Sequence, residues 1–422
     1  MKAVILVAGK GTRLQPLTDN TPKPMLNVAG RPLLEWMINR VKEAGINEIL
    51  LVTNYLEEQI KEYFGDGSAH GVSISYKTQE ETQGTANAFY QAKEFVGDGD
   101  FMALYGDHYL AEGVLKKLKE AHKTSEATVS ALLVDDPSQL GAFELDGEYI
   151  TKVVEKPPKG KEPSKYANVG VYIFPSKIFR YIEKTSLSPR GEYEITDTMQ
   201  LMIKDQIPHR KHDLETMDWL DIGLPWTLLE ANSRAMKCVD FKIEGDVEEG
   251  ARILGPVWVK KGARIRSGVY IEGPVVIGED CDIGPNCYIR AGTCLGKRVR
   301  VGNACEIKNS IIGNDSHAAH LSYIGDSLIG INCNLGAGTI TANLRFDKTP
   351  IEVTIKEERL NSGLKKLGTI MGDNVQTGIN VSIHPGVIIG SDSWITPGIT
   401  VQRDVEEGVI KYFFSQSQEK PR

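Results

Sequence analysis

The sequence predicts two successive domains of different fold class. Residues 1–235 are expected to form an α/β domain built on a mixed sheet, residues 236–405 a parallel β-helix, and residues 406–422 a C-terminal tail. Three observations indicate this division. Short apolar strands alternate with helical segments in the first half, an aliphatic residue recurs at every sixth position in the second half, and none of the six cysteines lies before residue 238.

The alternation in the first half is regular enough to place its elements. Strands are expected at residues 3–7, 48–53, 73–77, 101–105 and 128–134, and helices at 32–44, 56–64 and 85–95. This spacing is typical of a Rossmann-like sheet that helices cover. Such sheets bind ligands at the carboxyl ends of their strands, so the loops after residues 7, 77 and 105 are the places to expect a site.

The six-residue period is the strongest signal in the chain. It continues through ten consecutive positions in one phase: Ile253, Val259, Ile265, Ile271, Ile277, Ile283, Ile289, Leu295, Val301 and Ile307. The phase slips after residue 307 and returns at Ile383, Ile389, Ile395 and Val401. Three such hexads form one triangular coil, and the aliphatic residues then stack into an internal column.

An insertion interrupts the repeat at residues 344–368. It carries six basic and four acidic residues, so we expect a solvated loop that projects from the β-helix. Insertions in repeat proteins collect on one face, which is often the binding face.

Composition excludes several classes of function. The 422 residues include 49 basic and 56 acidic side chains, a net charge of −7, whereas a general nucleic-acid binder needs a basic face. No apolar run approaches the roughly 18–20 residues that cross a bilayer, and the N-terminus becomes glycine-rich too early for a signal peptide. No cysteine pair has metal or redox spacing, so the thiols are expected to be reduced. We expect a cytoplasmic protein that acts on small molecules and binds neither nucleic acid nor membranes.

A glycine-rich loop follows the first strand and predicts a phosphate site. Gly9 and Gly11 allow close backbone approach, and Arg13 supplies positive charge. Lys23 lies further on between two prolines that restrict its backbone. On the loop alone, a tight turn with solvated charges is an equally good interpretation.

Together these motifs resemble the sugar-1-phosphate nucleotidylyltransferases, and the resemblance continues through the first domain. It implies in-line attack of a sugar phosphate on the α-phosphorus of UTP, with release of pyrophosphate and Mg²⁺ as cofactor. Arg13 and Lys23 would be the catalytic residues, and Asp107 and Asp221 would hold the metal ion. The substrate-binding residues that it implies here are Gly9, Gly11, Gln79, Gly84, Thr85, Gly141, Glu155 and Asn168.

The segments from Glu306 to Asp326 and from Asn334 to Asn343 resemble the acetyltransferase half of the bifunctional N-acetylglucosamine-1-phosphate uridylyltransferase/glucosamine-1-phosphate acetyltransferases. The resemblance implies a left-handed β-helix that assembles as a homotrimer and uses acetyl-CoA. His320 would be the general base and Asn343 would lie at the reacting amine or thioester. Five further substrate-binding or cofactor-binding residues follow: Lys308 and Lys366 for phosphate, Tyr323 and Asn334 for orientation, and Ala337 for acetyl-CoA.

Two other functions remain open at this stage. One is a monofunctional glucose-1-phosphate uridylyl- or thymidylyltransferase whose β-helix serves only assembly or regulation. The other is a non-catalytic regulatory subunit, which the presence of Arg13 and Lys23 disfavours. UTP or dTTP, and glucosamine or galactosamine, are left as alternatives. The insertion and the short tail depart from the bacterial bifunctional pattern, so contacts to CoA cannot be transferred residue by residue.

Overall fold

The computed structural model describes residues 1–81 and 83–412, which form two compact units. The first holds residues 1–10, 22–25 and 33–221. The second holds residues 11–21 and 26–32 together with the chain from residue 222 onward, upstream of the domain boundary predicted at 235. Two short N-terminal segments therefore belong to the unit that contains the β-helix.

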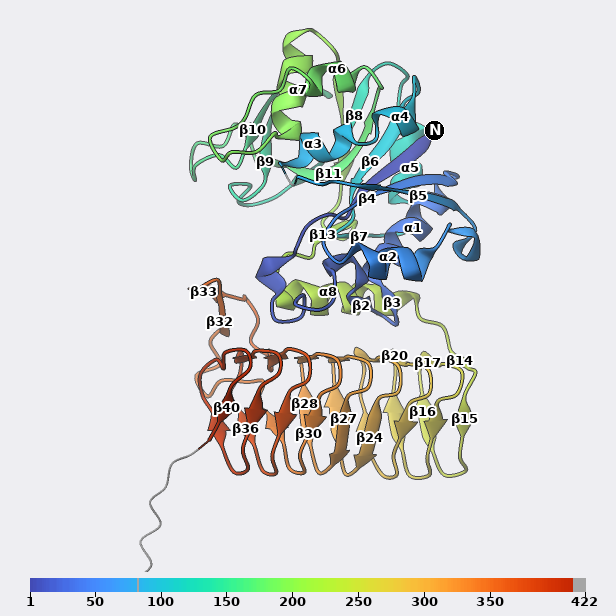
Figure 1. Cartoon of the computed structure of the whole chain (residues 1–422), viewed down its shortest axis with the longest axis vertical. Helices are drawn as coiled ribbons and strands as arrows, with labels where there is room; N and C mark the ends of the chain where they lie inside the picture. The colour runs from blue at the N-terminus through green and yellow to red at the C-terminus, as the bar shows by residue number, and fades with distance from the viewer. Residues whose placement is uncertain (82, 413–422) are drawn as a thin grey trace, which may run out of the picture. The chain divides into compact units, whose positions relative to one another are not determined.

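A nine-stranded mixed sheet forms the centre of the first unit (Figure 1). Four neighbours on one side, β5, β4, β1 and β6, run parallel, whereas β11 is antiparallel to both β6 and β8. In sheet order the strands are β5 (Ser73–Thr78), β4 (Glu48–Thr53), β1 (Lys2–Leu6), β6 (Phe101–Tyr105), β11 (Tyr166–Phe174), β8 (Ala127–Leu133), β12 (His209–Leu214), β10 (Tyr149–Glu155) and β9 (Gly141–Asp146). Two small antiparallel pairs join β7 (His108–Leu110) to β13 (Trp219–Asp221), and β2 (Asn27–Val28) to β3 (Arg31–Pro32) of the second unit.

Helices cover the sheet because their apolar sides are buried in two clusters with the strand residues. The helices of this unit are α1 (Leu33–Glu43), α2 (Glu57–Phe64), α3 (Thr85–Tyr90), α4 (Lys93–Val96), α5 (Val114–Ala121), α6 (Ile178–Ile182) and α7 (Ile195–Lys204). The helix predicted over 85–95 was wrong in one respect, since the chain leaves the helix at residues 91–92 and forms α3 and α4 separately. No helix among the described residues is long and apolar enough to cross a membrane.

Three parallel sheets form the β-helix (Figure 1), and we name each by its first strand. The β14 sheet contains β14 (Lys242–Ile243), β17 (Val257–Val259), β20 (Val275–Ile277), β23 (Thr293–Leu295), β26 (Ile311–Ile312), β29 (Leu328–Ile329), β34 (Ile370–Met371) and β37 (Ile388–Ile389). The β15 sheet contains β15 (Asp246–Val247), β18 (Arg264–Ile265), β21 (Asp282–Ile283), β24 (Arg300–Asn303), β27 (His317–His320), β30 (Asn334–Leu335), β35 (Gln376–Thr377), β38 (Trp394–Ile395) and β40 (Ile410–Lys411). The β16 sheet contains β16 (Arg252–Leu254), β19 (Tyr270–Glu272), β22 (Tyr288–Ile289), β25 (Glu306–Lys308), β28 (Tyr323–Gly325), β31 (Ile340–Thr341), β36 (Ser382–Ile383) and β39 (Thr400–Val401).

The internal column predicted from the hexads is confirmed. The aliphatic residues from Val259 to Ile307 are buried in one core cluster, against which Ile253 packs. The early coils have 18 residues, because Val257 pairs with Val275. The next coil is one residue shorter, since Cys294 pairs with Ile311, and this deletion causes the phase slip seen in the sequence.

The insertion is more ordered than the predicted loop. Strands β32 (Glu352–Ile355) and β33 (Glu358–Asn361) pair as an antiparallel hairpin (Figure 1). Val353 and Ile355 are buried, which stabilises the hairpin, and the exposed turn at residues 356–357 has positive φ. An isolated bridge between Leu344 and Lys366 closes its base.

The N-terminal segments of the second unit cover the outer face of the β14 sheet. The Gly30 amide lies 3.1 Å from the sulfur of Cys294, and Lys260 Nζ donates to the Gly30 carbonyl. In α8 (Pro225–Ala235), the buried Asn232 accepts from the Ala29 amide at 2.8 Å and donates to the Gly292 carbonyl at 2.8 Å. The outward residues of the middle strands of this sheet are apolar and buried, unlike those of the other two sheets: Val276, Cys294, Ile311, Leu328 and Ile370.

Candidate active sites

The residues of the predicted phosphate loop are divided between the two units. In the first unit, Gly9 follows β1 with no heavy atom within 4 Å of the Cβ that a side chain would add. In the second unit, Gly11 has a φ of +65°, which favours glycine, and precedes the short 3-10 helix Thr12–Leu14. The Arg13 side chain on this helix is exposed, and therefore accessible to a phosphate.

Lys23 pairs with one of the two predicted metal ligands, Asp107, within the first unit. The lysine is buried, and its Nζ lies 2.6 Å from Asp107 Oδ2. Asp107 follows β6, and pairing of β7 with β13 sets Asp221 opposite His108. Ligand atoms of Asp107, His108 and Asp221 all lie within 4.8 Å of one another. Two carboxylates at this spacing suit a hard cation such as Mg²⁺.

The charge of Lys23 controls ionisation in this cluster. Burial alone would raise the pKa of Asp107, but the Lys23 ammonium and His108 hold this pKa well below its usual range. Burial lowers the pKa of His108, so the imidazole is neutral at pH 7. Asp107 is therefore an anion that is ready to bind a metal ion or to neutralise Lys23.

The three residues predicted near the nucleotide base lie around one turn. Gln79 is buried, and its Nε2 donates to Asn87 Oδ1 at 2.8 Å, which fixes the plane of its amide. A Cβ on Gly84 would lie 2.6 Å from the carbonyl oxygen of Tyr193, so only glycine fits there. Thr85 Oγ1 accepts from the Ile195 amide and links this turn to α7.

The predicted sugar-binding residues meet where β9, β10 and β11 adjoin. Gly141 pairs with both Glu155 and Asn168. Glu155 Oε2 accepts from Thr196 Oγ1 at 3.2 Å, and burial together with the nearby charge of Glu194 raises the pKa of Glu155. The structure therefore brings these three predicted residues together.

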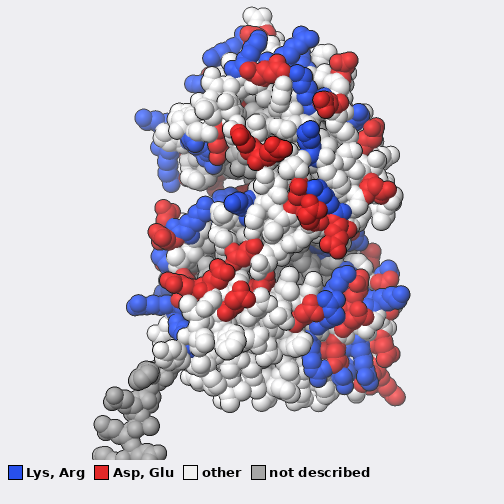
Figure 2. Space-filling view, viewed as in Figure 1, with Lys and Arg blue, Asp and Glu red and all other residues white. Residues whose placement is uncertain are grey.

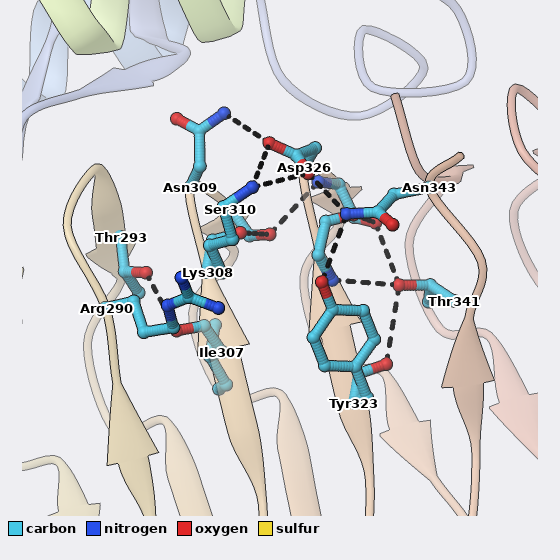
Figure 3. A network of polar contacts seen from close by, with 12 residues as sticks. Arg290, Thr293, Ile307, Lys308, Asn309, Ser310, Tyr323, Asp326, Thr341 and Asn343 are labelled. Carbon is cyan, nitrogen blue, oxygen red and sulfur yellow. Dashed lines mark hydrogen bonds and ion pairs between the residues drawn. The ribbon is translucent and has the colours of Figure 1, made fainter. Parts of the chain in front are cut away.

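The β-helix carries a second polar cluster, shown in Figure 3, along the corner that follows the β16 sheet. Lys308 Nζ lies 3.2 Å from Asp326 Oδ2, and Asn309 Nδ2 donates to Asp326 Oδ1 at 2.8 Å. Asn343 Nδ2 donates both to Asp326 Oδ2 and, at 3.1 Å, to Tyr323 Oη. Burial raises the pKa of Tyr323, which keeps this hydroxyl protonated. Three predicted residues are thus brought together around a carboxylate.

Three other predicted residues, His320, Asn334 and Ala337, lie on the β15 sheet and at the corner that follows it. His320 ends β27 in the β15 sheet with an exposed side chain, and its carbonyl accepts from the Gly338 amide, which follows Ala337. Asn334 is exposed on the neighbouring strand β30. Tyr323 begins β28, the strand of the β16 sheet that separates the two corners, so these two groups flank one face of the β-helix. Lys366 is exposed at the base of the hairpin.

Each break in the hexad period falls at the corner of the polar cluster. The inward column steps from Ile307 to Ile312 and from Ile324 to Ile329, five positions instead of six. These shortened corners carry Lys308, Asn309 and Asp326, and the hairpin insertion leaves the next coil at the same corner. The loss of phase is therefore a signal for the site.

Sequence reasoning missed four polar residues in these clusters. His108 adjoins the metal ligands, Asp326 binds the predicted residues Lys308 and Asn343, and Asn309 donates to Asp326. Arg290 pairs with Glu306 at 2.8 Å in the coil below Tyr323. The shortened corners could have indicated Asn309 and Asp326. No feature of the sequence distinguishes Arg290 or His108 from ordinary charged or polar positions.

Comparison with known proteins assigns the class of each half. A nucleotidyl transferase model matches residues 2–237, and the GMPPB C-terminal domain matches residues 253–317 and 271–389. A crystal structure of a protein assigned as a glucose-1-phosphate thymidylyltransferase from Bacillus anthracis matches with a TM-score of 0.52 and 30% identity. It covers 57% of this chain and 97% of its own. The predicted fold class is confirmed: a nucleotidyltransferase domain followed by a left-handed parallel β-helix.

Relatives that match nearly the whole chain define the family. The bifunctional protein GlmU of Methanocaldococcus jannaschii is 42% identical, and that of Methanococcus maripaludis strain C7 is 46% identical. Each match covers 98% of this chain and 97% of the relative. The bifunctional sugar-1-phosphate nucleotidylyltransferase/acetyltransferase of Sulfurisphaera tokodaii is 39% identical over 97% of this chain and 99% of its own. The chain belongs to this family of bifunctional transferases, so the monofunctional and regulatory alternatives are not favoured.

Proposed function

We propose that the first unit transfers a uridylyl group from UTP to N-acetylglucosamine-1-phosphate. The observation that carries this proposal is the cluster of Lys23, Asp107 and Asp221, which combines a buried cation with two carboxylates. A phosphate oxygen of the sugar attacks the α-phosphorus, the bond to the β-phosphate oxygen breaks, and pyrophosphate leaves. Mg²⁺ held by Asp107 and Asp221 would supply charge neutralisation at the phosphates.

The other residues of this unit position the two substrates. Lys23 stabilises phosphate charge, and Gln79 presents a fixed amide to the base. Gly9 leaves room for the triphosphate, Gly84 and Thr85 shape the turn, and Gly141, Glu155 and Asn168 bind the sugar.

The second unit supplies this N-acetylated sugar phosphate by acting as an N-acetyltransferase for glucosamine-1-phosphate. The amine attacks the thioester carbonyl of acetyl-CoA, His320 takes the amine proton, and the CoA thiolate leaves. Lys308 and Lys366 bind the phosphate, while Tyr323 and Asn334 orient the sugar and Ala337 lies against acetyl-CoA. Asn343 uses its amide nitrogen on Asp326 and Tyr323, so its carbonyl oxygen is left for substrate and suits the amine, a hydrogen-bond donor.

The β-helix also supports assembly as a homotrimer. Figure 2 shows charged side chains gathered over the early coils and a largely uncharged surface toward the later coils. The outward residues of the later β15-sheet strands include Trp394, which is 55% exposed, as well as Asn334 and Gln376. Burial of such a face between copies would be favourable. Sedimentation of the purified protein should give a trimer or a multiple of it, and a stable monomer would contradict this assembly.

One assay tests both activities. Purified protein is incubated with Mg²⁺, UTP, acetyl-CoA and either glucosamine-1-phosphate or galactosamine-1-phosphate, and the products are identified by mass. We expect a UDP-N-acetylhexosamine from glucosamine-1-phosphate. Substitution of dTTP for UTP measures the base preference, and omission of acetyl-CoA separates the two steps. Release of pyrophosphate without acetylation of either amino sugar would refute the acetyltransferase proposal alone.

A further inference from the structure

One carboxylate, that of Asp326, lies at the centre of the β-helix cluster in Figure 3. Its side chain is only 5% exposed. Burial of a carboxylate is costly unless cations and hydrogen-bond donors satisfy it. The donors here are Lys308, Asn309 and Asn343, and two of these are the proposed ligands of the substrate phosphate and amine.

The backbone holds Asp326 rigidly between neighbouring coils. Its amide donates to the Lys308 carbonyl at 2.9 Å, and its own carbonyl accepts from the Gly368 amide at 2.8 Å. Its φ of +50° is a conformation that aspartate tolerates better than most residues and that aims the side chain along the corner. These backbone hydrogen bonds therefore fix the position from which the Asp326 side chain extends.

A lysine side chain has many rotamers, so Lys308 would be mobile without a partner and would lose rotamer entropy when substrate fixed it. The Asp326 carboxylate binds the ammonium while leaving the lysine side chain 21% exposed, so a phosphate can still reach it. The same carboxylate turns the amide of Asn343 so that the nitrogen faces inward. Ordering of both groups before substrate arrives reduces the entropic cost of binding.

We propose that Asp326 is a positioning residue for acetyl transfer, which orders Lys308 and Asn343 through one buried carboxylate. The inference rests on the proposed acetyltransferase function of the second unit. Asp326 contacts the two binding residues, and no contact of its own with the reacting atoms is invoked.

The first test is Asp326→Asn in the full-length chain. Asparagine has the same size, but its nitrogen would face the Lys308 ammonium or the Asn343 amide, and the ion pair is lost. We expect the KM for glucosamine-1-phosphate to rise about tenfold or more, with a smaller fall in kcat. Nucleotidyl transfer should be unchanged. Asp315→Asn is the matched control, because this carboxylate also pairs with a β-helix cation, Arg298, but at an exposed position outside the cluster.

A double-mutant cycle distinguishes positioning from a structural role. In a Lys308→Ala, Asn343→Ala background, Asp326→Asn should change KM by less than about threefold, because the groups on which it acts are absent. The same factor in both backgrounds, or an unchanged KM in the single variant, would overturn the proposal.

A second variant covers the case in which Asp326→Asn fails to fold. Asn309→Gly removes one donor to the carboxylate and tolerates the φ of +45° at this position. We expect a KM increase of about two- to threefold with normal nucleotidyl transfer, and an unchanged KM would count against the proposal. Absence of acetylation by the wild-type protein would instead refute the proposed function itself.

Discussion

The charge on Asp107 is central to the proposed phosphoryl-transfer site. Asp107→Asn keeps the size of the side chain but removes the anion that pairs with Lys23. We expect nucleotidyl transfer to slow by about 10²–10³, because lost charge stabilisation at such a centre commonly costs a few kcal/mol. Pyrophosphate release at saturating Mg²⁺ measures this, with acetyl transfer as the internal control. A variant with the wild-type rate would show that Asp107 does not hold the metal.

Gly325 gives a second prediction at the scale of one residue. A Cβ there would lie 2.4 Å from Tyr323 Oη and 2.7 Å from Asn343 Nδ2. Both atoms are ends of side chains that can move, so Gly325→Ala should shift the thermal midpoint little. It should nevertheless slow acetyl transfer about tenfold, because the hydrogen bond between Tyr323 and Asn343 is broken.

A large loss of thermal stability in Gly325→Ala, or normal acetyl transfer, would contradict this description of the cluster. Calorimetry and thiol release from acetyl-CoA are the two measurements.

Motifs in the sequence predicted many of the candidate residues but not the polar residues that contact and position them. The resemblance implies roles for Lys308, Tyr323 and Asn343, whereas the contacts of Asp326 with Lys308 and Asn343 form only when three coils stack around it. The proximity of His108 to Asp221 likewise depends on a pairing between two short strands that lie far apart in the chain.

At the scale of single elements, β12 contains a histidine whose burial makes the first unit sensitive to acid. His209 Nδ1 lies 2.9 Å from the Ile207 carbonyl oxygen, and burial lowers the pKa of His209 to about 4. An unfolded histidine has a pKa of about 6.5. The folded form therefore gains stability above that pH and loses it as pH falls toward 4, by up to about 3 kcal/mol.

His209→Asn should reduce this pH dependence, because the asparagine nitrogen can donate to the same carbonyl without titrating in this range. Urea unfolding of the first unit at pH 7 and pH 4.5 measures the effect. An equal loss of free energy of unfolding in wild type and variant would contradict the assignment to His209.

The repeat shows what periodicity can and cannot predict about elements. Ten hexads in phase determine the inward column, because any other register would expose the aliphatic residues. The hairpin β32–β33 was not predictable, since its residues have mixed charge and the burial of Val353 depends on the coil beneath it. The split between α3 and α4 was also missed, because residues 91–92 contain neither glycine nor proline.

For the whole molecule, the cysteines report whether the β-helix is packed as described. Cys238 is exposed, whereas the other five thiols are buried. Burial raises the pKa to about 12 for four of them, namely Cys281, Cys287, Cys294 and Cys333. Native protein treated with iodoacetamide at pH 8 should therefore be modified once, at Cys238, and at all six positions after denaturation. Rapid modification of a second thiol in native protein would show that the core is open.

The central claim is that one chain carries two transferase sites that act independently, one in each unit. The most direct test measures acetyl transfer and nucleotidyl transfer side by side for wild type and His320→Ala. His320 is exposed and lies outside the internal column, so its removal leaves the core intact. We predict that acetyl transfer falls by about 10²–10⁴ while pyrophosphate release is unchanged. Acetyl transfer at the wild-type rate in His320→Ala, or no acetylation of either amino sugar by the wild type, would contradict the account.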